Sequence, residues 1–227
     1  HRFILHIAAE KGYSIGEAVV VVAPQNDAPV ALADSYAGVA TEPLIIGTSG
    51  RPLIEANDAS WYYIDDGQDQ DSLNPKWRQG PEAGFDPAAS GWRGPHPAQL
   101  GFGEGDEHTR INDAGTFGSL TYYFFTTFDL IGVPQKLILD LKQDDGAAVY
   151  VNGVEVITAN LPTPHPYYVG ALETLDDDGQ SFVRYELNSA DLNLLPVGNT
   201  LAVEVHQVNW FSSDVTFDLR LFDPGLG

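Results

Sequence analysis

The chain contains no cysteine among its 227 residues. Disulfide bonds therefore cannot staple the fold, and thiol catalysis and cysteine-ligated zinc are excluded. No run of 18 or more apolar residues is present, so no helix is predicted to span a bilayer. No signal peptide is recognisable, and the sequence opens at His1 directly in strand-like sequence. We interpret it as a piece of a longer, processed or truncated polypeptide.

Basic residues are also scarce. Lysine and arginine number 11 against 32 acidic residues, which gives a formal net charge of −21. A surface of this charge repels nucleic acid and anionic membranes, so neither is an expected partner. It suits bound cations, salty surroundings or simple solubility, and the sequence leaves these readings open.

The residues that are abundant favour a β protein. Apolar residues make up 43% and aromatic residues 11%, and there are 23 glycines and 15 prolines. This mixture is typical of many short strands separated by turns. No long segment has helical periodicity, and only residues 191–195 suggest a short helical turn. The composition predicts an all-β fold, an antiparallel β-sandwich.

Alternating apolar residues locate the strands. In residues 200–205, for example, Leu201, Val203 and Val205 are expected to face the core. Residues 65–118 are rich in loops, and loops this long in a compact domain are usually functional or ordered by ions. The strands predicted for the main domain are residues 44–46, 61–64, 121–130, 136–141, 182–187, 200–205 and 215–221.

Residues 144–156 are the clearest local signal in the chain. Val149 and Val151 should point to one face of a strand, and Tyr150 and Asn152 to the other. Asn152-Gly153 then fits the two central positions of a type I′ turn, which need positive φ. The segment predicts a β-hairpin that follows an acidic turn at Asp144-Asp145.

Residues 1–30 are predicted to be a separate part of the chain. Residues 2–9 and 17–23 read as two strands, followed by Asn26-Asp27-Ala28-Pro29-Val30. This segment resembles the junction between tandem cadherin-like repeats of bacterial surface proteins. The resemblance implies an N-terminal β-hairpin appendage with its linker, and a main domain over residues 31–227. Because two strands alone are marginally stable in water, residues 1–23 should pack on the main domain or on neighbouring copies of the chain.

A series of motifs runs through the main domain: Trp61 with Asp65-Asp66-Gly67, Leu100-Gly101-Phe102-Gly103, Thr121-Tyr122-Tyr123-Phe124, Asp144-Asp145-Gly146 with Asn152-Gly153, and residues 199–207. In these motifs the main domain resembles the galactose-binding-like jelly-roll accessory modules of bacterial exoproteins, a carbohydrate-binding-module-like group, and its hairpin is similar to that of PA14 domains. The resemblance covers about residues 44–222 and implies a secreted or cell-surface jelly roll. Where the family has an arginine after the 121–124 strand, this chain has Phe125 and Thr126.

Clustered carboxylates predict a structural calcium ion. Calcium takes six to eight oxygen ligands, and like-charged carboxylates repel one another unless a cation or a proton intervenes. The alternative is a plain hydrophilic loop in which aspartates cap turns. Asp176-Asp177-Asp178 is a further acidic run. The candidate calcium ligands are Asp65, Asp66, Asp69 and Asp71 in one loop, and Glu104, Asp106 and Glu107 in another.

Aromatic residues in polar loops predict a sugar-binding surface. Sugars are recognised by flat aromatic faces that contact their C–H patches, beside polar groups that bind their hydroxyls. Any single tryptophan could instead be a core residue, and an exposed aromatic patch could equally bind protein. The candidate ligand-binding residues are Trp77, Trp92, Arg93, Tyr167, Tyr168, Asn209, Trp210 and Phe211.

No catalytic motif is present. The sequence lacks HExxH, GxSxG and a phosphate-binding glycine loop. Paired acids are too abundant here to indicate a glycosidase. The sequence therefore predicts a non-catalytic extracellular carbohydrate-binding module. The alternative is an adhesive module that assembles a surface layer, matrix or filaments by strand exchange through residues 1–23.

Overall fold

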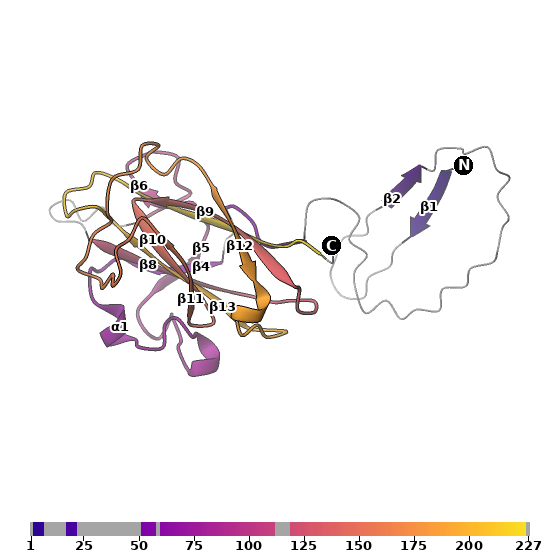
Figure 1. Ribbon diagram of the computed structural model, residues 1–227, viewed down its shortest axis with the longest axis horizontal. Helices are drawn as coiled ribbons and strands as arrows, with labels where there is room; N and C mark the ends of the chain where they lie inside the picture. The colour runs from indigo at the N-terminus through magenta and orange to yellow at the C-terminus, as the bar shows by residue number, and fades with distance from the viewer. Residues whose placement is uncertain (1, 7–16, 22–50, 58–59, 112–118, 226–227) are drawn as a thin grey trace. The chain divides into compact units, whose positions relative to one another are not determined.

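The computed structural model describes residues 2–6, 17–21, 51–57, 60–111 and 119–225. Chain contacts divide the protein into two compact units, His1–Thr41 and Glu42–Gly227 (Figure 1). The domain boundary predicted at residue 30 and the strand predicted at residues 44–46 lie outside the described residues.

The first unit contains a two-stranded antiparallel sheet. Strand β1 (Arg2–His6) pairs with β2 (Glu17–Val21), with Ile4 opposite Val19. Both strands lie inside the ranges predicted from the sequence. Within the described residues each of these strands pairs only with the other.

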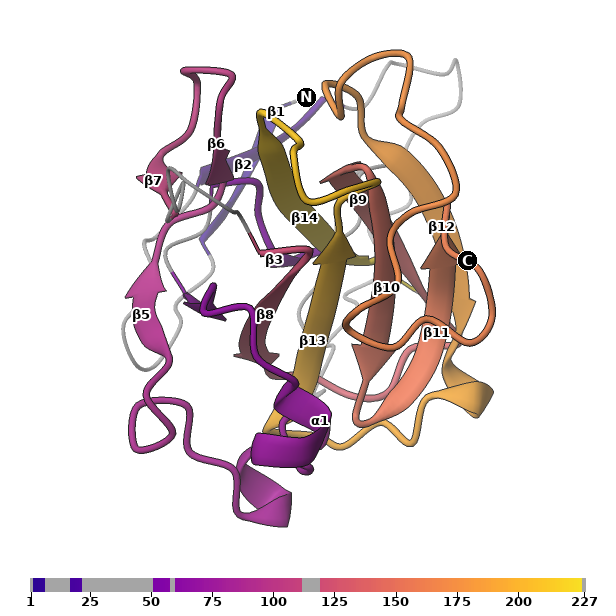
Figure 2. The same ribbon diagram turned by 90° about the vertical axis from the view of Figure 1, so that its left-hand side faces the viewer.

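The second unit consists of two packed β-sheets (Figure 2). Among its described strands, all pairs are antiparallel except β6 with β7. What we call the β13 sheet has the order β11 (Val154–Ala159), β10 (Gly146–Val151), β13 (Asn199–His206), β8 (Thr121–Phe128), β4 (Trp61–Ile64) and β5 (Arg93–His96). The β14 sheet has the order β12 (Val183–Asn188), β9 (Lys136–Asp144), β14 (Val215–Asp223), β6 (Leu100–Phe102) and β7 (Thr109–Arg110), and β3 (Arg51–Ile54) also pairs with β14.

Helical structure is minor, as the sequence predicts. Among the described residues it comprises α1 (Gln70–Leu73) and two 3-10 turns, η1 (Pro81–Ala83) and η2 (Ser189–Asp191). Within the described ranges, none of these helices is long and apolar enough to cross a membrane. The predicted fold class, an all-β antiparallel sandwich, is confirmed.

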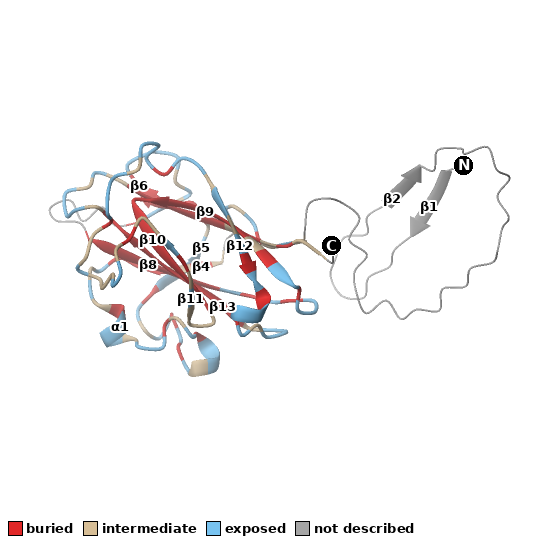
Figure 3. Cartoon of the chain, in the orientation of Figure 1, coloured by how far each residue is buried: buried red, intermediate tan, exposed pale blue. Residues whose placement is uncertain are grey.

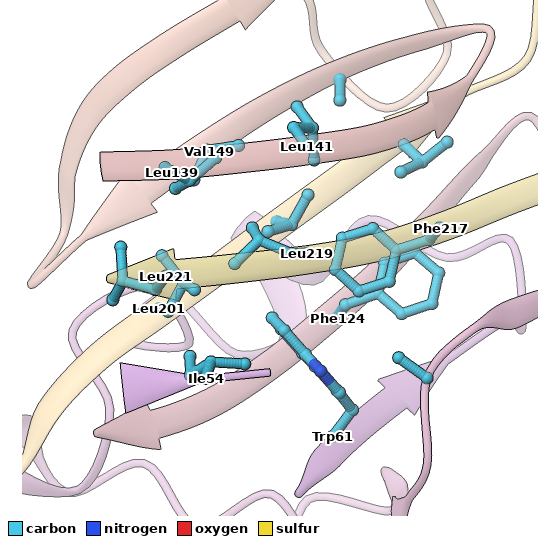
Figure 4. Close-up of a cluster of buried hydrophobic side chains, with 14 of the residues drawn as sticks. Ile54, Trp61, Phe124, Leu139, Leu141, Val149, Leu201, Phe217, Leu219 and Leu221 are labelled. Carbon is cyan, nitrogen blue, oxygen red and sulfur yellow. The ribbon is translucent and has the colours of Figure 1, made fainter. Parts of the chain in front are cut away.

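Side chains from the inner faces of both sheets form the main core. Phe217 of β14 stacks on Phe124 of β8, with ring centroids 4.1 Å apart, and meets the edge of Trp61 at 4.8 Å (Figure 4). Offset and edge-to-face ring pairs add stability beyond the area they bury. Leu201, Val203 and Val205, which were predicted to face inward, lie in this core. Alternate residues of β14 lie there too: Val215, Phe217, Leu219 and Leu221.

The predicted hairpin is present at β10 and β11. Asn152 and Gly153 have φ values of 49° and 80°, the positive φ values that a type I′ turn requires. Val149 and Val151 lie in the main core, whereas Tyr150 lies in a second cluster on the other face of the sheet. The alternation predicted from the sequence is therefore confirmed.

Strand β3 and the end of β14 lie side by side. Arg51 is opposite Asp223 in the register, and Leu221 is opposite Ile54. The Arg51 guanidinium donates to the Asp223 carboxylate at 3.3 Å. The first and last described strands of this unit are thus paired in the β14 sheet.

The central strands of the β13 sheet are buried on both faces. Every residue of β10 and β13 is buried, and Figure 3 shows these strands in red along their length. One face forms the main core, and loops cover the other. Polar side chains on that outer face consequently need partners within the protein.

Phe217 should be essential for stability, because two aromatic rings of the main core pack against it. Phe217→Ala is expected to lower the free energy of unfolding by about 3–5 kcal/mol, measured by urea denaturation. Phe211→Ala, which truncates an exposed ring of the same type, should change it by less than about 0.5 kcal/mol. A small effect of Phe217→Ala would show that the ring stack is not part of the folded core.

Candidate functional site: aromatic loops beside crowded carboxylates

A second hydrophobic cluster covers the outer face of the β13 sheet. Trp77 packs against the edges of Tyr123 and Tyr150, with ring centroids 5.2 and 5.9 Å away. Trp92 lies 5.8 Å from Trp77 and 5.4 Å from Phe85. The side chains of Trp77 and Trp92 are 0% and 4% exposed. Both were candidates for sugar stacking. Because a buried ring presents no face to a ligand, we exclude Trp77 and Trp92 from the candidate sugar-binding residues.

The first acidic loop builds a helix start and ion pairs. Asp69 is the N-cap of α1 and accepts from the backbone of Asp71 and Ser72. Asp71 accepts from the indole of Trp77 at 2.8 Å and pairs with Arg78 at 2.6 Å. The sequence did not predict α1, because its capping aspartate stands in a run that also reads as a cation loop.

The remaining acids of this loop are also engaged. Asp66 accepts from the backbone N–H of Gln68 and from the Gln70 side chain. Asp65 is buried and pairs with the Arg93 guanidinium at 3.3 Å. Arg93 lies 5.8 Å from the Tyr63 ring, and a hydrogen bond with Tyr63, together with Asp65, raises its pKa. Arg93, a candidate sugar ligand, thus sits beside β4 as a half-exposed ion-pair partner.

The second acidic cluster closes its own loop. Glu107 accepts from the backbone N–H groups of Glu104 and Gly105. Asp106 accepts from Gln99 at 2.9 Å and lies 3.8 Å from the Lys142 ammonium. Across residues 51–57, 60–111 and 119–225, no group of three or more His, Asp or Glu side chains is arranged to hold a metal ion. The carboxylates predicted to bind calcium therefore do not form a ligand set in this structure.

Two other candidate segments lie side by side at one end of the sandwich. The backbone N–H of Ala171 donates to the carbonyl of Gln207 at 3.0 Å. A Cβ added to Gly170 would lie 2.6 Å from the carbonyl oxygen of Val208, so glycine allows the close approach. We name residues 167–171 and 207–214 the paired loops. They bring together Tyr167, Tyr168, Asn209, Trp210 and Phe211.

The paired loops present aromatic rings to solvent. Tyr168, Trp210 and Phe211 are 62%, 45% and 80% exposed. Tyr167 is half-buried, and its ring meets Tyr168 edge-on at 5.4 Å. Asn209 closes the turn by accepting from the backbone N–H of Phe211 at 2.8 Å. Exposed rings on ordered loops are typical of surfaces that contact a ligand or partner.

Asp145, in the turn between β9 and β10, anchors the second of the paired loops. Its carboxylate accepts from the backbone N–H of Val208 at 2.7 Å. Its carbonyl accepts from the side chain of Asn160, which also donates to the carbonyl of Glu173. The acidic turn that the sequence singled out thus contacts the loop that carries Trp210 and Phe211.

Carboxylates crowd together beside this anchor. Burial and the neighbouring Asp145, Asp214 and Asp178 raise the pKa of Asp144 to about 8. Desolvation and contact with Asp214 also raise the pKa of Glu104. A proton on Asp144 relieves the repulsion, so this end of the molecule becomes more strained as the pH rises.

A buried charged group that the sequence did not predict lies under the paired loops. Glu204 on β13 is only 2% exposed and accepts from the hydroxyl of Tyr150 at 2.6 Å. Arg78, His165 and His206 lie 3.3 to 3.6 Å from its carboxylate oxygens. The alternation of β13 places Glu204 and His206 on the outer face, but no sequence signal indicated that His165 and Arg78 would meet them.

The two packed sheets place this unit in the class of antiparallel β-sandwiches. The chain is similar to β-glucuronidases from Bacteroides uniformis (18% identity, 74% of this chain and 17% of that one, TM-score 0.45), an uncultured Clostridium species (14%, 78% and 30%, 0.44) and Ruminococcus gnavus (13%, 74% and 23%, 0.42). It spans less than a third of the length of these enzymes. No protein-family model and no curated protein sequence matches the chain.

The crowding at Asp144 predicts a pH-dependent stability. The pKa of Asp144 is about 4 in the unfolded chain and about 8 in the fold. Between these two values the native state binds a proton that the unfolded state does not, so stability falls as the pH rises. Asp144→Asn removes this titration. Its thermal midpoint relative to the unsubstituted protein should therefore increase from pH 5 to pH 9, measured in the presence of a chelator.

Asp176→Asn is the matched control, because it removes the same charge from an exposed position of the same end. It reports the effect of net charge alone. Equal pH profiles for the two variants would contradict the assignment of the raised pKa to Asp144.

Proposed function

We propose that this protein is a non-catalytic, extracellular carbohydrate-binding module that uses the paired loops. The observation that carries the proposal is the exposure of Tyr168, Trp210 and Phe211 on two loops joined by main-chain hydrogen bonds. Rigid aromatic faces stack on the C–H patches of sugar rings. Asp214, a half-buried member of the crowded carboxylates in the same loop, can accept from sugar hydroxyls.

The charge of the protein narrows the ligand class. At a net charge of −21, it repels anionic polysaccharides over the range of the Debye length. A neutral glycan meets no such barrier. Binding through a few exposed rings is weak at one site, so multiple copies in a parent protein would supply avidity.

Binding without catalysis is the simpler proposal for this surface. The carboxylate with the strongest set of proton donors, Glu204, is 2% exposed and closed to a polymeric substrate. A glycosidase needs an acid and a second carboxylate on opposite sides of an accessible glycosidic bond. The aromatic rings offer contact area and no proton transfer.

The glycan-binding proposal is tested on an array of neutral glycans. Trp210→Ala is expected to weaken retention by about tenfold, which corresponds to about 1.4 kcal/mol of binding free energy. The thermal midpoint should stay within about a degree or two, because the truncated ring is exposed. Unchanged retention would rule out the paired loops as the sugar-binding surface.

Val197→Ala is the control, because it truncates an exposed apolar side chain in the loop between β12 and β13, outside the paired loops. It should bind like the unsubstituted protein. Loss of binding in both variants would point to a general surface effect.

An adhesive function is the second candidate, and the sheet of the first unit favours it. Strands β1 and β2 form a two-stranded sheet, which is marginally stable alone. A strand from a neighbouring copy could add to either edge. Size-exclusion chromatography of the chain with and without residues 1–30 distinguishes the candidates, since a monomer in both cases contradicts strand exchange.

We include a structural calcium ion in the proposal because the protein is strongly acidic. The structure supplies no ligand set for it in the described ranges, but the carboxylates near Asp144 repel one another and a cation would relieve this. Calcium that binds only the folded state stabilises it by about 2.7 kcal/mol at 100 times its Kd.

Millimolar calcium is therefore expected to raise the thermal midpoint at pH 8 by several degrees, and a chelator to reverse this. Magnesium is the control, because its stricter octahedral geometry disfavours an irregular carboxylate cluster. No shift with either ion would remove the metal from the proposal.

A further inference from the structure

Two histidines contact the buried carboxylate of Glu204. His165 belongs to the segment that leads to the paired loops, and His206 belongs to β13. His165 Nε2 lies 3.4 Å from Glu204 Oε1, and His206 Nε2 lies 3.6 Å from Glu204 Oε2. Their ring centroids are 6.1 Å apart. We name His165, His206 and Glu204 the Glu204 cluster.

The other nitrogen of each ring faces a backbone carbonyl. His165 Nδ1 lies 3.2 Å from the carbonyl oxygen of Pro162, and His206 Nδ1 lies 2.7 Å from that of Val169. A carbonyl oxygen only accepts, so Nδ1 must carry a proton in both rings. The two rings therefore join the backbone of residues 162–169 to the carboxylate of Glu204.

This arrangement leaves Nε2 of each ring facing an acceptor. In the neutral ring, Nε2 would direct a lone pair at a carboxylate oxygen. In the doubly protonated ring, it directs an N–H there instead. Tyr150 does not supply the missing proton to His165, because its hydroxyl donates to Glu204 at 2.6 Å. His206 Nε2 is buried and makes no hydrogen bond.

The charged groups around the cluster favour a proton on the His165 ring. The negative groups are Glu204 on β13, Glu155 on β11, 3.5 Å from His165, and Asp71 on α1. Arg78, which pairs with Asp71 and Glu204, is the permanent cation beside them. Burial and Glu204 raise the pKa of Tyr123 on β8 and of Tyr150 on β10, so both stay neutral.

We infer that the Glu204 cluster holds residues 162–169, and with them the aromatic face of Tyr168, against the β13 sheet while the His165 ring is protonated. We call this proton-dependent attachment the fastening. Glu204 acts as a positioning residue through the two histidines. One consequence is that glycan binding weakens as the pH rises, and this consequence rests on the proposed function. The fastening itself is a property of the fold.

The direction of the pH effect follows from the charged groups. The hydrogen bond with Glu204 raises the pKa of His165 although burial opposes it. Burial also opposes the ionisation of Glu204, but the adjacent His165 and His206 rings and the charge of Arg78 hold its pKa well below the usual range. The stabilisation is thus complete below the unfolded histidine pKa of about 6.5 and is lost as the pH rises through the raised pKa of His165.

The direct test follows the imidazole nitrogens of the full-length chain by NMR after labelling its histidines with nitrogen-15. The His165 ring should stay doubly protonated above the ordinary titration range near pH 6.5, and Glu204→Gln should abolish this shift. Glu155→Gln is the matched control, because Glu155 contacts His165 and not His206, so it should alter one ring only. A His165 ring that titrates in the ordinary range in the unsubstituted protein overturns the inference, and this measurement needs no variant to fold.

A second measurement follows the loop without any glycan. Hydrogen exchange of residues 162–171, corrected for intrinsic rates, should accelerate as the pH rises through the pKa of His165, by about tenfold for each unit by which that pKa is raised. His165→Gln should show the fast exchange at every pH. Exchange independent of pH would contradict the fastening.

Glycan retention measured from pH 5.5 to pH 9 separates the two proposals. If the ring titration and loop exchange behave as expected but no glycan binds at any pH, the fastening stands and the proposed function fails. If glycan binds equally at every pH while the loop exchange stays constant, the proposed function stands and the fastening fails.

Discussion

The constraint that governs this protein is a β-sheet covered on both faces. Strands β8, β10 and β13 bury one set of side chains against the β14 sheet and the opposite set beneath loops. Polar groups on the second set cannot reach water, so Glu204 and Tyr150 need partners from Arg78 and the histidines. Packing and the polar cluster are thus two consequences of the same arrangement.

The strands were predictable because their signals are local. Alternation predicted that Leu201 and Val203 face the core, and the Asn152-Gly153 pair predicted the hairpin turn, in which both residues have positive φ. What covers the outer face was not predictable. Trp77 reads alike as a sugar ligand or as a core residue, because the strands that bury it follow more than 40 residues later in the chain.

The candidate site was predictable in part for the same reason. Tyr168 and Trp210 stand in polar loops, and the structure brings those loops together as neighbours. The acids proved harder to interpret, since one aspartate can cap a helix, pair with arginine or bind an ion. Asp69 caps α1 and Asp65 pairs with Arg93, functions that depend on partners a sequence does not reveal.

The pairing of β3 with the end of β14 has a mechanical consequence. Since Arg51 lies opposite Asp223, a force that pulls these two residues apart acts across the ladder and separates its hydrogen bonds one after another. A strand pair resists this unzipping far less than it resists sliding of one strand along the other, because in sliding all the hydrogen bonds bear the load at once. Under tension applied at these two positions, β3 would peel away first, while the ring stack of Phe124 and Phe217 stays intact.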